Sequence, residues 1–484
     1  MRGRSVAVVV AAAAVAAGCT GAVRSDGGSD SGSTLTARFV DRNGDGVLER
    51  GPGEPLLERT DLAPRSRVVR PLAMFAQITD AHVVDEESPA RVEMLDRLGA
   101  PFEGAFRPQE SLTGQVLSAA VASIDRLRPQ AVVETGDLVD NAQQNELDEA
   151  IAVLRGGRVD PNSGAPGYQG VQAAGDADPF YYRPDVDPPR HPGLLRAAEK
   201  PFASPGLRAP WYPVLGNHDL LVQGNLAPTR ETNAVAVGDR KLVGLNAAAK
   251  NAVRARRLTP AVIDALLAHG LPGPSIRVAP DPRRRELSAL AVIARIRRAS
   301  GLGGRGAFLD YVFDIGGSVR GIVLDDVHHR SGAGAIVRPF QVTWLRRQLA
   351  RAGRRWVIVF SHEALDGASG GAALLALLDR DPHVVATVAG NTHRNSVVAR
   401  ATEAGGYWSI TTASLVDFPQ EVRAFRLART RGGVVLQTWM LDTDPRSRLA
   451  SISRELAFLD YQGGRVGHDA GTRGDRNVSL YLAR

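Results

Sequence analysis

Cysteine and lysine are the residue types that this chain of 484 residues has least of. The single cysteine, Cys19, excludes a disulfide bond within the chain. Lysine occurs only at positions 200, 241 and 250, so arginine supplies almost all the positive charge behind the formal net charge of +7. The arginine clusters are short, and solvated helix faces account for them as well as a basic binding surface would. We therefore expect no nucleic-acid partner.

The apolar run near the N-terminus is too short to span a bilayer. It extends over residues 6–17, follows two arginines and ends just before Cys19, a pattern typical of a secretory signal peptide. The segment AAGC at residues 16–19 resembles a bacterial lipobox. A cysteine beside an ordinary cleavage site would look the same, but it would leave an exported chain with a free thiol. We expect residues 1–18 to be removed and Cys19 to be lipidated, which places the mature protein on the extracytoplasmic face of the cell membrane.

The remainder of the chain has an ordinary globular composition, with 44% hydrophobic and 23% charged residues. Residues 19–35 are rich in Gly and Ser and indicate a flexible tether. Residues 36–70 form an N-terminal segment, and residues 71–484 are expected to form one domain. Two long insertions, at residues 154–210 and 220–306, each begin just after a polar motif and are expected to cover the site and to set the size of its substrate.

The N-terminal segment contains a possible calcium loop. Asp41, Asn43, Asp45 and Gly46 occupy the first, third, fifth and sixth positions of such a loop, but the twelfth position holds Pro52 instead of glutamate. The same residue types make turns without an ion. The sequence leaves both interpretations open.

From Pro71 onward, apolar runs alternate with amphipathic segments. The runs LAMFAQIT, AVVET, WYPVL, VRGIVL, RWVIVF, VVATVA and GYWSITTAS are expected to form buried strands. Residues 111–127 and 341–352 carry helical periodicity, and residues 424–441 indicate a hairpin through Gly432 and Gly433. The pattern predicts an α/β fold with β-sheets covered by helices.

Polar side chains follow five of these strands directly, where an open α/β sheet places its ligand crevice. Turn chemistry accounts for Asp, Asn and Gly at such positions, but not for histidine at four of the five strand ends. The residues are Asp80 and His82, then Asp137, then Asn217, His218 and Asp219, then His362, and finally Asn391 and His393.

These motifs, in this order between Thr79 and His393, resemble those of the calcineurin-like, or purple-acid-phosphatase-like, metallophosphoesterases. The pattern of that family is Asp-x-His, Gly-Asp-x-x-Asp, Gly-Asn-His-Asp, a lone His and Gly-His-x-His, and a single residue differs here. The segments TDAHVVDEESPARVE and GGRVDPNSG look like a secreted, actinobacterial-type branch. The resemblance implies two packed mixed β-sheets flanked by helices, with the insertions forming a lid.

The resemblance also implies a dinuclear metal site that hydrolyses phosphate monoesters or diesters through a bridging hydroxide. The ions would be Mn, Fe or Zn, with Mg or Ca possible at the second position. Asp80, His82 and His393 would hold one ion, Asn217, His362 and Asn391 the other, and Asp137 would bridge them. His218 would donate a proton to the leaving oxygen, and Asp219 would hold the tautomer of His218.

Asn391 is the one departure from the family pattern, because it stands where the family has the first histidine of Gly-His-x-His. An amide oxygen can still bind a hard cation, although it is a poorer ligand for Zn than imidazole. We expect an active enzyme, because the other motif residues are present. The alternative is a non-catalytic binding lipoprotein on a degenerate scaffold.

Overall fold

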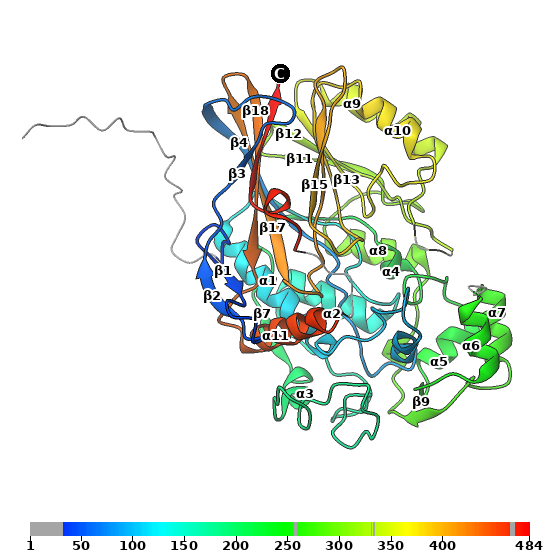
Figure 1. Cartoon of the computed structure of the whole chain (residues 1–484). Helices are drawn as coiled ribbons and strands as arrows, with labels where there is room; N and C mark the ends of the chain where they lie inside the picture. Colours follow the sequence, from blue (N-terminus) through cyan, green and yellow to red (C-terminus); the bar gives the residue numbers. More distant parts are fainter. Residues whose placement is uncertain (1–31, 256–258, 331, 333, 465–469) are drawn as a thin grey trace, which may run out of the picture.

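Two mixed β-sheets pack against each other, and helices cover their outer faces, in the computed structural model of this chain (Figure 1). The structure describes residues 32–484 except 256–258, 331, 333 and 465–469. The architecture confirms the predicted α/β class with packed mixed sheets flanked by helices. The signal segment, Cys19 and most of the tether lie outside the described residues.

The larger sheet has seven strands in the order β3-β19-β18-β17-β4-β5-β8. Strands β4, β5 and β8 are parallel to one another, whereas β17 joins β4 and β18 in antiparallel pairs. The strands are β3 (Leu57–Arg59), β4 (Val68–Ile78), β5 (Ala131–Glu134), β8 (Trp211–Pro213), β17 (Glu421–Thr430), β18 (Gly433–Asp442) and β19 (Val478–Ala483).

The smaller sheet has six strands in the order β11-β12-β13-β14-β16-β15. Strands β12, β13, β14 and β16 are parallel, and the edge strands β11 and β15 are antiparallel to their neighbours. The strands are β11 (Tyr311–Ile315), β12 (Val319–Val323), β13 (Trp356–Phe360), β14 (Val384–Ala389), β15 (Ser396–Arg400) and β16 (Tyr407–Thr411).

The core between the two sheets consists of their inward-facing apolar side chains. Phe75 of β4 stacks on Phe425 of β17 with ring centroids 4.5 Å apart, and meets the edge of Phe360 from the other sheet at 5.8 Å. All three rings, together with Trp408, are fully buried. Because the side chains of both sheets share this cluster, the relative position of the sheets is fixed by packing.

Helices α1, α2 and α8 pack on the larger sheet, and α9 and α10 on the smaller one. The helices are α1 (Thr113–Leu127), α2 (Gln144–Arg155), α3 (Leu194–Ala198), α4 (Asn217–Leu220), α5 (Arg230–Ala236), α6 (Ala247–Arg254), α7 (Pro260–Leu267), α8 (Ala289–Ala299), α9 (Pro339–Ala352), α10 (Gly371–Leu378) and α11 (Arg448–Gln462). Short 3-10 turns lie at Glu93–Leu98, Glu110–Leu112, Pro282–Arg284 and Arg473–Asp475.

All seven apolar runs picked out in the sequence are strands, in order β4, β5, β8, β12, β13, β14 and β16. The amphipathic segments are α1 and α9, and the expected hairpin is β17 and β18. These elements could be predicted because each carries its own periodicity. The N-terminal segment is partly integrated into the larger sheet, since β3 pairs with β19 and β4 already begins at Val68.

The possible calcium loop forms a turn between β1 (Ala37–Val40) and β2 (Glu49–Pro52). The Asp41 carboxylate accepts hydrogen bonds from the backbone N–H groups of Gly44 and Gly46, at 2.7 and 3.0 Å. These bonds lower the pKa of Asp41. The turn is therefore stabilised by hydrogen bonds between the Asp41 side chain and the backbone of the turn itself.

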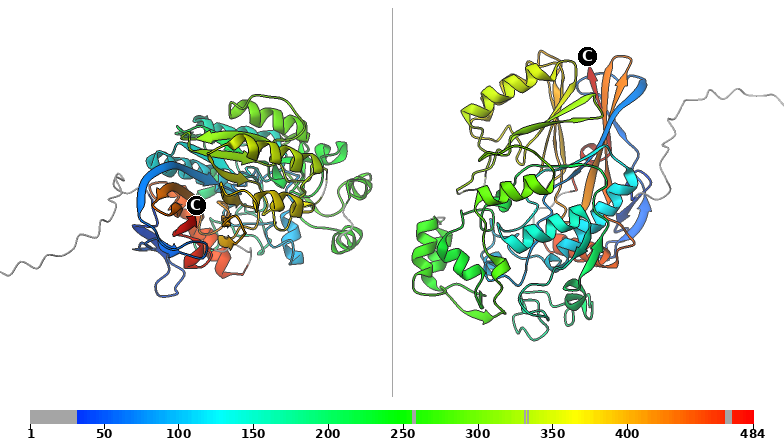
Figure 2. Two further views of the ribbon diagram at one scale, coloured as in Figure 1. Left: turned by 90° about the horizontal axis from the view of Figure 1, so that it is seen from above. Right: turned by 180° about the vertical axis from the view of Figure 1, so that it is seen from behind.

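The two insertions differ in structure. Residues 154–210 are mostly irregular, with the pair β6 (Gly157–Val159) and β7 (Phe202–Ser204) and helix α3. Residues 220–306 contain α5 to α8 and the pair β9 (Arg240–Leu242) and β10 (Ser275–Arg277). Helices α5, α6 and α7 with β9 and β10 form a lobe that projects from the sheets (green in Figures 1 and 2). We call this lobe, residues 230–278 without 256–258, the insertion lobe.

A buried ion pair anchors the insertion lobe to the loop after β4. Lys241 of β9 is fully buried, and its Nζ lies 2.6 Å from Oε1 of Glu93. The same ammonium donates to the carbonyl oxygens of Glu86 and Ser88 at 2.8 and 3.0 Å. The ammonium thus has one carboxylate and two carbonyl oxygens as its neighbours. The loop that contains these acceptors begins just past His82, so the pair links the lobe to the candidate site.

Removing one partner of this pair should destabilise the fold, because the other charge would stay buried without compensation. We expect Lys241→Ala to lower the free energy of unfolding by about 3–5 kcal/mol. The matched control, Lys250→Ala at an exposed position of α6, should change it by less than about 0.5 kcal/mol. Urea denaturation followed by circular dichroism measures both. Equal losses in the two variants would contradict an anchoring role for Lys241.

Candidate metal centre

The carboxyl ends of parallel strands from both sheets meet at one place. Asp80 and His82 follow β4, Asp137 follows β5, and His362 follows β13. Asn391 and His393 follow β14, and Asn217 begins α4 after β8. Three groups of side chains here each offer one ligand-type atom per residue, and within a group these atoms lie within 4.8 Å of one another: Asp80 with His82 and His393, His82 with Asp137 and His218, and Asp80 with Asp137 and His362.

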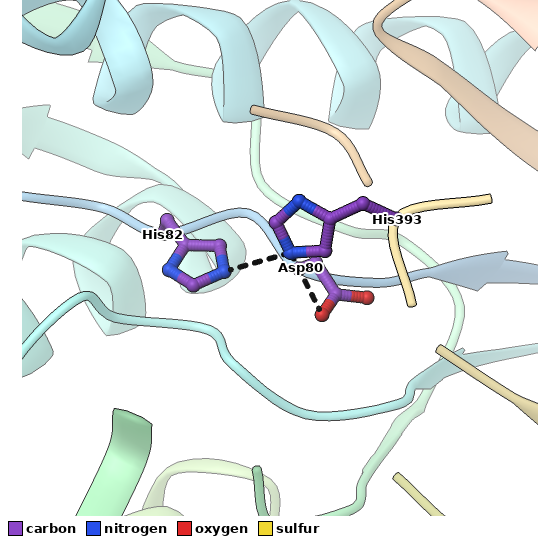
Figure 3. Close-up of side chains that lie close together, drawn as sticks. All are labelled: Asp80, His82 and His393. Carbon is purple, nitrogen blue, oxygen red and sulfur yellow. Dashed lines mark hydrogen bonds and ion pairs between the residues drawn. The ribbon is translucent and has the colours of Figure 1, made fainter. Parts of the chain in front are cut away.

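Figure 3 shows the first group, Asp80 with His82 and His393. The Nε2 atoms of His82 and His393 are 3.3 Å apart, and the Nε2 of His393 is 3.5 Å from Oδ1 of Asp80. Asp80 is fully buried and His82 nearly so. Two imidazole nitrogens and a carboxylate oxygen thus face one point, which is the arrangement of three ligands around a cation.

Asp137 lies between the first group and His362. Its Oδ2 is 3.7 Å from Nε2 of His82 and 3.4 Å from Nε2 of His362. The Nε2 of His362 is in turn 3.1 Å from Oδ1 of Asn217. Asn217 donates through its amide nitrogen to the carbonyl of Gly224 at 3.1 Å, which turns its oxygen toward His362. One carboxylate is therefore shared by two neighbouring sets of ligand-type atoms.

The opposite ring nitrogen of each of these three histidines has an oxygen acceptor. The Nδ1 of His82 lies 3.1 Å from Oδ1 of Asp140. The Nδ1 of His362 lies 2.8 Å from the carbonyl oxygen of Thr135, and the Nδ1 of His393 lies 2.5 Å from Oδ2 of Asp417. A carbonyl accepts a hydrogen bond only from a protonated Nδ1, and the carboxylates favour the same tautomer. The lone pair of Nε2 then faces the shared centre, as metal-ligating histidines require.

Backbone strain is concentrated at the same residues. Eight non-glycine residues in the described part of the chain have positive φ, and five of them are Asp80, His82, Asp137, Asn391 and His393. Their φ values lie between 43° and 62°. Each such residue costs about 1–3 kcal/mol and persists where the surrounding structure enforces it. Strain gathered at one place in this way marks a functional site.

The environment of the site is strongly charged. Burial by itself lowers the pKa of His393, but hydrogen bonds to Asp417 and Asp80 outweigh it and raise the pKa to about 9. Burial raises the pKa of Asp137, but the neighbouring His362 and His218 hold that pKa well below its usual range. Burial dominates at His82 and lowers its pKa. The carboxylates thus draw positive charge toward the centre, which is also what a dication would supply.

The donor set fits divalent metal ions. It consists of three imidazole nitrogens, the carboxylates of Asp80 and Asp137, and the amide oxygen of Asn217. Mixed nitrogen and oxygen donors suit Mn, Fe and Zn. Because two neighbouring sets of ligand-type atoms share Asp137, the site has enough donor atoms to hold two ions.

Asn391 enters the site through its backbone. Its N–H lies 3.1 Å from both carboxylate oxygens of Asp80, and the residue is left-handed with φ 62°. Gly390, just before it, has no room for a side chain, because a Cβ there would overlap Thr79 and Asp80. The side chain of Asn391 lines the same cavity as His82, Asp137 and His393. Its position is thus compatible with ligation, which stays a prediction.

The expected role of Asp219 requires correction. Its carboxylate accepts hydrogen bonds from the backbone N–H groups of Gly216, Asp137 and Val139, at 2.8, 3.1 and 3.2 Å. The Nδ1 of His218 instead lies 2.8 Å from the carbonyl oxygen of Asp140, with the Asp140 carboxylate at 3.8 Å. Adjacent residues at the start of α4 point to different sides, so Asp219 holds the loops together while Asp140 orients His218.

Several residues that support the ligand-type side chains were not assigned from the sequence. Asp140 accepts from Arg91 at 2.9 Å and from Gln223 at 2.6 Å, besides its bond to His82. Asp417 pairs with Arg107 at 2.7 Å. Residues 412–416 separate Asp417 from the end of β16, so the rule that polar residues directly follow strands did not find it. The arginines carried no signal of this kind either, because long loops bring them to the site.

Comparisons with known proteins give distant structural similarity. No family model and no curated protein matches the chain. One similar solved structure is a dimetal phosphatase from Danio rerio, at 14% sequence identity and a TM-score of 0.37, covering 77% of this chain and 99% of that one. Another is the sulfate thiohydrolase SoxB of Thermus thermophilus in complex with glycerol, at 12% identity and a TM-score of 0.31, covering 83% of this chain and 62% of that one.

Substitution of Asp219 and His218 should separate their two roles. Asp219→Ala leaves three buried N–H groups without acceptors, at about 1–3 kcal/mol each, so we expect a large drop in the melting temperature. His218→Ala removes a side chain that is 24% exposed and should cost less than about 1 kcal/mol. Thermal unfolding of both variants checks this. A loss at His218 as large as that at Asp219 would mean that His218 also supports the fold.

Proposed function

We propose that this chain is a metal-dependent phosphoesterase of the calcineurin-like type. The observation that carries the proposal is the convergence of the Nε2 atoms of His82, His362 and His393 on the carboxylates of Asp80 and Asp137. Each Nδ1 is meanwhile held by an oxygen acceptor. Such a set of nitrogen and oxygen donors binds divalent cations, which promote attack by water on a phosphate ester.

The residues divide the work of hydrolysis as follows. Asp80, His82 and His393 would hold one divalent ion, Asn217, His362 and Asn391 the other, and Asp137 would contact both. Bound ions of this kind stabilise negative charge on the phosphoryl oxygens. His218, whose Nδ1–H donates to the carbonyl of Asp140, would in its doubly protonated form donate the proton on Nε2 to the leaving oxygen. Arg91 and Gln223 keep Asp140 in place from the opposite side.

The proposal includes export and lipid anchoring of the mature chain through Cys19. This residue lies outside the described residues, so the support is the signal-like segment alone. Within the part of the chain that the structure describes, no helix has the length and apolar character to cross a membrane. Mass spectrometry of the mature N-terminus tests the anchor, because a diacylated cysteine adds the mass of its lipid. An unmodified terminus would refute it.

The activity can be tested with p-nitrophenyl phosphate and bis(p-nitrophenyl) phosphate, each with Mn, Zn, Mg or Ca. We expect metal-dependent release of p-nitrophenol by the parent. Asp137→Asn should abolish both turnover and metal binding, because it removes the charge shared by both sets of ligands. The control Asp148→Asn, on an exposed part of α2, should behave as the parent. Absence of turnover with every metal would favour the non-catalytic binding protein instead.

Asn391 tests the second metal position. Asn391→Gly removes the amide but keeps both the left-handed backbone and the N–H that Asp80 accepts. We expect the metal content to fall from about two ions per chain to about one, whereas Asn391→His should bind Zn and Mn more tightly. Elemental analysis after dialysis measures both, with the exposed Thr392→Ala as control. Two tightly bound ions in Asn391→Gly would mean that Asn391 is not a ligand.

A further inference from the structure

A cavity of about 740 Å³ opens from the candidate metal centre into the insertion lobe. His82, Asp137 and His218 line its polar end. Its other walls are formed by the insertion lobe and by the loop after β4, which meet across it. One continuous space therefore joins the candidate chemistry to the part of the chain inserted between β8 and β11. Its volume lies within the range of small-molecule sites.

Helix α7 supplies an apolar wall of this cavity. Ile263, Leu266 and Leu267 line it, at spacings that put them on one face of the helix. None of the residues of α7 is buried, although its sequence, PAVIDALL, is mostly apolar. The middle of the helix is held to the start of α5, because the side chain of Asp264 accepts from the hydroxyl of Thr229 at 2.7 Å. Its apolar face is thus fixed in position and turned toward an open space.

The facing walls are apolar as well. Leu242 of β9 and Val253 of α6 belong to the insertion lobe, and Met94, Leu95 and Phe102 come from the loop after β4. The polar pair Thr232 and Glu286 is an exception, and its members hydrogen-bond to each other at 2.6 Å. Phe102 is the single phenyl, phenol or indole ring among the described residues that line the cavity. A nucleobase would need aromatic side chains on which to stack, whereas the aliphatic walls of this cavity match a hydrocarbon chain.

We propose that the substrate is a phosphate ester of an aliphatic alcohol, with the phosphate at the metal centre and the hydrocarbon chain in the cavity beside α7. This inference rests on the proposed phosphoesterase activity. Water adds its oxygen to phosphorus and the P–O bond to the alcohol breaks. The departing oxygen takes a proton, so the products are inorganic phosphate and the free alcohol. The apolar walls and the polar end account for the two parts of such a molecule.

Chain length is the variable that tests this assignment. We expect kcat/KM for methyl, butyl, hexyl and octyl phosphate to rise by about fourfold per added methylene, because each methylene leaves water for an apolar wall. Release of inorganic phosphate from the metal-loaded full chain measures the series. A flat or falling series, with methyl phosphate still hydrolysed, would overturn the aliphatic substrate while leaving the phosphoesterase activity standing.

A binding measurement separates the two proposals. Octylphosphonate and methylphosphonate contain a C–P bond that hydrolysis of an ester does not cleave, so calorimetry reports their affinities without turnover. We expect octylphosphonate to bind more tightly by the same factor per methylene. If no ester is hydrolysed but octylphosphonate still binds more tightly, the proposed activity fails and the cavity assignment holds. Equal affinity for both phosphonates would refute the assignment.

Leu266→Gln places a polar group on the α7 wall and should reduce the octyl-to-methyl ratio of kcat/KM by about tenfold. The matched control is Leu290→Gln, since Leu290 of α8 is 61% exposed and should leave the ratio unchanged. Equal ratios in the two variants would contradict the cavity as the site of the chain. Circular dichroism confirms that both variants fold.

The alcohol could come from solution or from a lipid surface, because both present the same phosphate and chain. Dissolved octyl phosphate and phosphatidylcholine vesicles that contain phosphatidic acid distinguish these sources. Hydrolysis of phosphatidic acid in the vesicles would assign a membrane lipid. Hydrolysis of octyl phosphate alone would assign a soluble amphiphile. Hydrolysis of neither, with p-nitrophenyl phosphate turned over, would overturn the aliphatic substrate.

Discussion

The hydrogen bonds behind the histidines are the interactions on which the site depends. Without the acceptors at Asp140, Asp417 and the carbonyl of Thr135, each imidazole could rotate or take the other tautomer. With them, each Nε2 is aimed at the centre before any ion arrives. The acceptors are in turn held, since Arg91 pairs with Asp140 and Arg107 with Asp417. The ordering of the centre thus extends outward through two layers of buried polar groups.

The ordering of these side chains costs folding free energy. Buried charges lose hydration, and those of Asp140 and Asp417 are compensated by arginines within hydrogen-bond distance. The left-handed backbones at Asp80, Asp137 and His393 add strain. The two sheets supply the rigidity that maintains both, because their shared apolar core fixes the strand ends relative to one another. A site made of five strand ends needs such a core, since each strand contributes only one or two groups.

The insertion lobe bounds the cavity beside the candidate metal centre. It follows the segment of Asn217 in the sequence and forms a wall of the cavity across from the loop after β4. The buried Lys241 and Glu93 pair joins these two walls directly. A cavity bounded by a fixed lobe has a defined shape. In the enzyme that we propose, the strand ends would set the chemistry of the site and the lobe would select substrates by size and polarity.

The sequence by itself determined the elements and the positions of the ligand-type residues. Strands and helices carry their periodicity locally, and Asp80, Asp137, His362 and His393 directly follow apolar runs, so their common edge could be predicted. The partners of those residues could not be predicted. The side of α4 on which Asp219 lies, the pairing of His218 with Asp140, and the approach of Arg91 and Asp417 were decided only by the tertiary structure. The physical reason is that hydrogen bonds between residues far apart in the chain depend on loop paths and on the direction of each side chain, which periodicity does not contain.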